Sequence, residues 1–152
     1  MRTSLLMLAL LLSGPALAVT TPTSESAAAP ETLEDWLHDL EASRGADRLL
    51  AARELRRRAR SAHRRLGGSA FARLEAEVGR DELIHLAVGP IGRALIDDDR
   101  VRAPLADAAL ALETPALLSA LREALRLTER PRAIRHLSRA IAAIEALPAS
   151  AP

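Results

Sequence analysis

Apolar residues recur at spacings of three and four positions almost throughout the chain after residue 30, and no segment alternates with period two. Spacings of three and four place apolar side chains on one face of an α-helix, whereas strands alternate at every second position. The β-branched residues that favour strands are also sparse. We therefore expect an all-α domain over residues 31–148, with about seven helices.

The first two helices have clear boundary signals. Thr32 suits an N-cap and Asp35 the first turn of a helix from Leu33 to about Ala42. Gly45 suits a left-handed position after that helix. The second helix is expected from about Ala46 to Leu66, and the pair Gly67-Gly68 stops it. Its buried stripe is expected to comprise Ala52, Leu55, Ala59, Ala62 and Leu66.

The middle of the chain predicts three short helices. Ser69 caps the first, which ends at Gly79, and Asp81 caps the second, which ends at Gly89-Pro90. Glycine and proline are poor residues for a helix interior, so each is read as a break. The third short helix covers residues 91–96.

Proline positions define the remaining helices. Pro104 fits only the first turn of a helix that contains Val101, Leu105, Ala108 and Leu112. Thr114-Pro115 predicts a helix start, because proline is favoured at the first helical position. Pro131 starts the last helix and Pro148 ends it. The inward face of the last helix is expected to comprise Ile134, Leu137, Ile141 and Ile144.

Short connections make successive helices antiparallel. The expected fold is therefore an all-α array of antiparallel helix pairs, either a right-handed-type α-solenoid or an irregular array. Alanine is frequent on the apolar faces, which allows the helices to approach closely.

The segment from Leu33 to Leu55 carries a recognisable order of residues. A first helix and a turn are followed by Arg48, two free positions, the small pair Ala51-Ala52, and then Leu55. This order resembles a HEAT-like repeat of the short type found in phycocyanobilin-lyase-like proteins. Arg102, followed by Ala106 and Leu110, resembles a second, irregular opening, and Ile134-Arg135 with Ser138 a weak third. The resemblance implies a binding scaffold, with Arg48 bridging carboxylates of the turn, and carries over no lyase residue.

The N-terminus has the layout of a secretory signal peptide. Arg2 precedes the apolar run from Leu5 to Leu12, and the small-residue site Ala16-Leu17-Ala18 follows. The apolar run is too short for a spanning helix, which needs about 20 residues. We expect residues 1–18 to be the signal peptide, cleaved after Ala18, residues 19–30 a flexible spacer, and residues 149–152 a loose tail. The protein is then periplasmic or secreted.

Composition removes several classes of function. The chain has no cysteine, so a disulfide framework, a thiolate metal site and a cysteine nucleophile are excluded. All of the 21 basic residues are arginine, and loss of Arg2 with the signal peptide would balance them against the 20 acidic residues. With one Trp, one Phe and no Tyr, there is no aromatic platform for single-stranded nucleic acid. No cofactor and no small-molecule substrate are inferred.

The strongest candidate site is an arginine face on the second helix. It comprises Arg53, Arg56, Arg57, Arg60 and Arg64, on the side opposite the apolar stripe. Guanidinium groups pair well with carboxylates and phosphates, so this face suits an anionic partner. The alternative is a solvated face that pairs with the acidic residues of the first helix, which are Glu34, Asp35, Asp39 and Glu41. Surface pairs of that kind are each worth only ~0–1 kcal/mol.

Other candidates for chemistry are weaker. Asp97-Asp98-Asp99 lacks the spacing of a calcium loop, and an acidic turn before a helix explains it. His38, His63, His85 and His136 have no metal-ligand spacing and are expected to be isolated. No serine-nucleophile or phosphate-loop motif occurs. Trp36 is expected to anchor the core of the first helix pair.

These observations predict an exported, non-enzymatic helical-repeat scaffold. Its partner is expected to be another macromolecule, most simply an acidic protein, bound through the arginine face. The alternative is a peripheral envelope protein that binds anionic lipid or polymer through the same face. An enzyme would need a carboxylate or histidine cluster assembled from distant helices.

Overall fold

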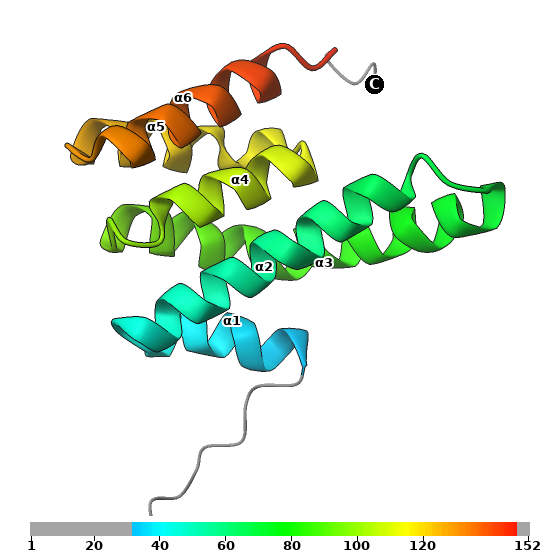
Figure 1. Cartoon of the computed structure of the whole chain (residues 1–152), viewed down its shortest axis with the longest axis horizontal. Coiled ribbons are helices and arrows are strands. Elements are labelled where there is room, and N and C mark those ends of the chain that lie inside the picture. The colour runs from blue at the N-terminus through cyan, green and yellow to red at the C-terminus, as the bar shows by residue number, and fades with distance from the viewer. Residues whose placement is uncertain (1–31, 149–152) are drawn as a thin grey trace, which may run out of the picture.

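The computed structural model describes residues 32–148, which contain helices and no strand (Figure 1). The expected signal peptide, spacer and C-terminal tail lie outside these residues. In chain order the helices are α1 (Leu33–Ala42), α2 (Ala46–Arg65), α3 (Ala70–Asp97), α4 (Arg102–Leu112), the 3-10 helix η1 (Pro115–Leu117), α5 (Leu118–Leu127) and α6 (Pro131–Glu145). The all-α class and the expected number of about seven helices are confirmed.

Successive helices form pairs, and the pairs are arranged in two layers. Helices α2, α4 and α6 pack side by side in one layer, while α1, α3 and α5 form the other (Figure 1). The core between the layers is rich in fully buried alanine, including Ala52, Ala94 and Ala109. Small side chains at these positions let the helix backbones approach closely, as the sequence predicts, and leucines such as Leu55, Leu105 and Leu137 fill the remaining space.

The first two helices match their predicted boundaries. Thr32 caps α1 in a capping box, in which its hydroxyl accepts from the Asp35 backbone and the Asp35 carboxylate accepts from the Thr32 backbone. Gly45 has the expected positive φ of 71°, but it stands at the N-cap of α2. The C-cap of α1 is Ser43, in an extended conformation.

The three short helices expected in the middle of the chain are one continuous helix. Helix α3 runs through Gly79, Gly89 and Pro90 without a break, and Ser69 caps it as predicted. The prediction was wrong because it weighed local propensity alone. Leu83, Ala87 and Ile91 lie on either side of the expected breaks and are all buried, so packing against α1, α2, α4 and α5 holds the helix together.

The C-terminal half of the chain differs from the predicted helix boundaries and burial in two details. Thr114-Pro115 begins η1, and α5 itself starts at Leu118. Pro131 starts α6 as predicted, but the helix ends at Glu145, and Ile134 is partly exposed where it was expected to face inward. Ala133 and Ala140 are buried in α6 together with Leu137 and Ile144, where the helix packs against α4 and α5.

The connected ends of α2 and α3 project as a helical hairpin beyond the other helices (Figure 1). Ala62 and Leu66, expected at the buried end of the α2 stripe, are only partly buried. Phe71, Leu74 and Val78 on α3 are largely exposed. The apolar pattern thus continues past the point where the core ends.

Candidate binding groove

A groove of about 490 Å³ crosses the layer formed by α2, α4 and α6. Its lining includes the apolar residues Leu49, Ala103, Pro104 and Ala133. Five arginines, one carboxylate and one histidine complete the lining, namely Arg53, Arg56, Arg100, Arg130, Arg132, Asp99 and His136. The groove lies at the N-terminal halves of α4 and α6, whose helix dipoles add to the positive potential of the arginines.

Asp107 binds the three helices of this layer to one another. Its carboxylate on α4 is only 5% exposed and lies 2.8 Å from the Arg60 guanidinium and 3.7 Å from that of Arg56, both on α2. On the other side, its Oδ1 is 2.7 Å from Nδ1 of His136 on α6. Because a buried carboxylate needs such partners, Asp107 fixes the positions of the side chains beside the groove.

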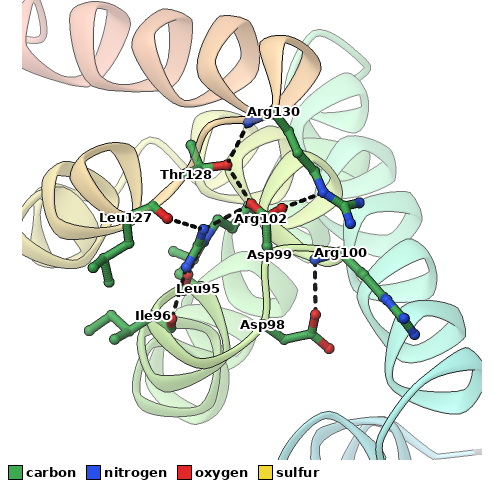
Figure 2. A network of polar contacts seen from close by, with 9 residues as sticks. All are labelled: Leu95, Ile96, Asp98, Asp99, Arg100, Arg102, Leu127, Thr128 and Arg130. Carbon is green, nitrogen blue, oxygen red and sulfur yellow. Dashed lines mark hydrogen bonds and ion pairs between the residues drawn. The ribbon is translucent and has the colours of Figure 1, made fainter.

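Asp99, the carboxylate that lines the groove, takes part in a dense polar network (Figure 2). It accepts a hydrogen bond from the Thr128 hydroxyl, forms an ion pair with Arg130, and lies 2.8 Å from Nη1 of Arg102. Burial alone would raise the pKa of the Asp99 carboxyl. The hydrogen bonds from Thr128 and Arg102, with the charges of Arg102 and Arg130, outweigh burial and hold the pKa below its usual value.

Arg102 is the buried member of this network. Its side chain is 5% exposed, and it donates to the carbonyl oxygens of Leu95 (2.8 Å), Ile96 (3.0 Å) and Leu127 (3.1 Å). These carbonyls belong to the last turns of α3 and α5, where no intrahelical donor remains. One guanidinium thereby holds the ends of two helices and orients Asp99 (Figure 2).

The groove carries more positive charge than its own carboxylates neutralise. Arg130 pairs with Asp99, and Arg56 lies near Asp107. Arg53, Arg100 and Arg132 have no ion-pair partner among residues 32–148. These three come from α2, the α3–α4 turn and α6, so unpaired cations stand on several sides of the groove.

The predicted arginine face lines a second hollow, of about 420 Å³, together with Trp36 and Leu50. The two hollows share Arg53 and Arg56, so they form one elongated basic surface. All five predicted residues contribute to it, which are Arg53, Arg56, Arg57, Arg60 and Arg64.

Helix α2 itself carries a carboxylate, Glu54, that neutralises part of the positive charge of this face. Arg57 donates to both Glu54 oxygens, at 2.7 and 2.6 Å, and Nε of Arg58 lies 3.0 Å from Glu54. The hydrogen bond from Arg57 lowers the pKa of Glu54 below its usual value, although burial opposes it. Arg64, like Arg53, has no ion-pair partner within the described residues.

Pairing with the first helix, the alternative for this face, accounts for none of the ion pairs that Arg56, Arg57 and Arg60 make. These go to Glu54 and Asp107, on α2 and α4. On α1, Glu41 pairs with Arg93 of α3 instead. The arginine face nevertheless borders α1, because Trp36 lines the second hollow beside it.

The remaining residues considered as candidates for chemistry make structural contacts within the fold. Asp97 lies 3.6 Å from Arg48, and Asp98 accepts from the backbone of Arg100, so the acidic run forms a turn between helices. Among residues 32–148, no three or more histidine or acidic side chains gather in a group that could hold a metal ion. Trp36 is partly buried and packs against the core as expected, although it also borders the second hollow.

Sequence reasoning missed four groove residues, which are Arg100, Arg130, Arg132 and His136. His136 was expected to be isolated, yet it contacts Asp107. A signal was available, because the second helices of successive pairs lie side by side in a helical-repeat array. The first turns of α4 and α6 then line the same groove as the first half of α2.

Comparison of the chain with protein-family models, with curated proteins and with solved structures finds no match to any of them. Among the described residues, no helix combines the length and the apolar character that crossing a bilayer requires.

Proposed function

We propose that this protein is an exported, non-enzymatic helical-repeat scaffold that binds an acidic segment of another protein in the basic groove. The observation that carries the proposal is the set of unpaired arginines on several sides of the groove, which are Arg53, Arg100 and Arg132. An acidic segment would supply the carboxylates that these guanidinium groups lack. Bidentate pairing of arginine with carboxylate gives such a contact both energy and orientation.

The shape of the basic surface favours an elongated protein segment. The second hollow adjoins the groove at Arg53 and Arg56, which line both, so a ligand that passes these two side chains would contact both hollows. Leu49, Pro104 and Ala133 offer apolar contacts between the charges, which a peptide with mixed side chains can use. The flat surface of a bilayer would not reach the lining of a concave groove, which disfavours the lipid alternative at this site.

A HEAT-like repeat is consistent with a scaffold of this kind, and one contact supports that interpretation. Nε of Arg48 donates to the carbonyl of Leu40 (2.7 Å), the third residue from the end of α1. Nε of Arg102 makes the same contact with Leu95, the third residue from the end of α3. The two residues that resemble repeat openings therefore perform the same structural task.

A non-enzymatic role is supported by the state of the groove's acidic groups. Asp99 and Asp107 are each engaged by arginine, and His136 is engaged by Asp107. A general base must reach a substrate proton, and both carboxylates are held in ion pairs with arginine.

The test is capture from an envelope extract of the source cells, using the tagged chain. We expect one stoichiometric protein with an exposed acidic segment to bind the native chain. The double variant R53E/R132E should lose that protein, because it reverses two unpaired groove charges. The control R44E/R126E makes the same change of charge away from the groove, and it should retain the protein. Capture that is unchanged by R53E/R132E would contradict the proposal.

A further inference from the structure

We propose that the tip of the α2–α3 hairpin, residues 61–74, is an anchor for the surface of an anionic membrane. The tip shares Arg64 with the second hollow but contributes no residue to the groove itself, and the proposal does not depend on the proposed function. It rests on an exposed apolar stripe, a local excess of positive charge and the position of the hairpin in the molecule.

The apolar stripe lies on the outward side of α3. Phe71, Leu74 and Val78 are 72%, 60% and 63% exposed, which is unusual for large apolar side chains. Their spacing of three and four residues places them on one face of the helix. Phe71 is the one phenylalanine of the chain, and it stands within the first turn of α3, beside the turn that joins the two helices.

The charge of the tip complements an anionic surface. Residues 61–74 include three arginines and no carboxylate. Arg73 donates to the carbonyl of Leu66 at the end of α2 (3.1 Å), while Arg64 and Arg65 are exposed and have no ion-pair partner within residues 32–148. Glu75 and Glu77 follow on the next turn, so the positive charge is greatest at the end that a membrane would meet first.

The hairpin also has the shape that such contact needs. It extends past the other helices, so its end can approach a flat surface without obstruction (Figure 1). Interfacial segments bind by inserting apolar side chains to the level of the lipid headgroups while arginines pair with the phosphates. Phe71 and Leu74, next to Arg64 and Arg65, supply both kinds of contact.

A second copy of the chain fits the exposed apolar stripe less well than a membrane surface does. Three exposed side chains amount to a patch on the order of a few hundred Å². Two such patches facing each other would bury less than the roughly 1,200 Å² that a stable specific interface needs. A lipid surface does not require that area, because each inserted side chain and each arginine adds to the affinity separately.

The first experiment places an environment-sensitive fluorophore at the tip. The chain has no cysteine, so the substitution Ala70→Cys gives a single labelling site, and Ser119→Cys on α5 gives an exposed control. The full chain is mixed with vesicles of phosphatidylcholine that contain about one third phosphatidylglycerol. We expect blue-shifted emission and about twofold or greater protection from iodide quenching at position 70, with little change at position 119. A tip label that stays exposed to water on these vesicles would overturn the proposal.

The second experiment measures partitioning onto the same vesicles by sedimentation. The variant F71S/L74S should bind about tenfold or more weakly, since two inserting side chains are lost. The control I96S/L127S removes two other exposed apolar side chains, at the opposite end of α3 and at the end of α5, and should bind like the native chain. All variants share residues 1–31, so any difference between them reports on the tip.

Three further results would overturn the anchor. Equal binding of F71S/L74S and the native chain would show that the stripe is not inserted. Tip-dependent binding that is equally strong on neutral phosphatidylcholine would remove the role of charge. A concentration-dependent dimer in sedimentation that F71S/L74S abolishes would assign the stripe to a second copy. R53E/R132E changes no residue of the tip. Evidence against ligand binding in the groove would therefore leave the expected results of these vesicle experiments unchanged.

Discussion

Arg102 joins three parts of the fold through one buried guanidinium group. It reaches the last turns of α3 and α5 and the Asp99 carboxylate ahead of α4. Removing a buried hydrogen-bonding partner leaves each of its acceptors unsatisfied, at about 1–3 kcal/mol per group. The network therefore depends on this side chain more than on any single surface ion pair, whose contribution is ~0–1 kcal/mol.

We expect Arg102→Ala to lower the free energy of unfolding by about 3 kcal/mol or more, because several carbonyls and Asp99 lose their donor. Arg102→Lys should recover only part of this loss, since an ammonium group lacks the planar fork of guanidinium. Arg100→Ala is the control, and its effect should be within about 0.5 kcal/mol because its exposed guanidinium has no ion-pair partner among residues 32–148. Urea unfolding of the three variants gives the comparison, and equal losses for Arg102→Ala and Arg100→Ala would refute the assignment.

Asp99 should make stability depend on pH in the acidic range. Its pKa is lower in the folded chain than in the unfolded chain, where it is about 3.9. A lowered pKa stabilises the fold above the unfolded value, and that contribution is lost as the pH falls through the folded value. Asp99→Asn cannot ionise, so the stability difference from the native chain should be largest near pH 7 and should shrink below about pH 4. Urea unfolding at about pH 7 and about pH 3 would test this, and a difference independent of pH would exclude it.

At the scale of the elements, arginines act as caps for the carbonyl ends of helices. Of the six α-helices that the structure describes, α1 to α5 each offer a C-terminal carbonyl to an arginine side chain. In the order α1 to α5, the donors are Arg48, Arg73, Arg102, Arg80 and Arg102, so Arg102 serves both α3 and α5. These positions satisfy acceptors that have no intrahelical donor and interact favourably with the helix dipole. The arginine-only composition thus has structural uses in addition to surface charge.

Helix α3 shows where local sequence signals fail and why. The boundaries of α1 and α2 could be predicted because Thr32, Asp35 and the Gly67-Gly68 pair act within one turn. The continuity of α3 could not, because it depends on residues such as Leu83 and Ile91 that are held by helices distant in the chain. Glycine and proline within α3 still carry their free-energy cost to helix formation, and tertiary packing offsets that cost.

Gly79 offers a direct test of this explanation. A Cβ added there meets nothing within 4 Å, and the residue lies within α3. Gly79→Ala should therefore raise the free energy of unfolding by about 0.5–1 kcal/mol, since alanine favours the helix. Gly45→Ala is the matched control, and it should destabilise, because the φ of 71° at Gly45 is strained for alanine. Thermal and urea unfolding give both values, and a destabilising Gly79→Ala would argue against a continuous helix at this point.

At the scale of the whole molecule, the groove exists only because of how the pairs stack. The arginine face of α2 was evident from its spacing, and all five of its residues border the elongated basic surface. Arg100, Arg130 and Arg132 join it from distant parts of the chain, through the packing of α2, α4 and α6. The partners of Asp107 and Asp99 could not be assigned from sequence, since neither an acidic residue in an alanine-rich helix nor one in an acidic turn carries a local sign of its distant partners.

The two proposed binding surfaces differ in shape. The concave groove suits an acidic protein segment, whereas the projecting tip suits a flat anionic membrane. Positive charge contributes to both, but the groove adds apolar contacts from its lining and the tip adds exposed side chains at its end. Measurements that separate the surfaces therefore need charge changes in the groove and apolar changes at the tip.

The most direct test of the central claim is the affinity of the groove for a defined acidic ligand. A fluorescently labelled peptide of alternating glutamate and alanine would be titrated with the native chain, R53E/R132E and R44E/R126E, with anisotropy as the readout, at low and at high salt. We predict binding that weakens about tenfold or more in R53E/R132E, remains in R44E/R126E, and falls as salt screens the charges. Equal affinity for all three chains, or equal loss in both variants, would contradict a specific acidic-ligand groove across α2, α4 and α6.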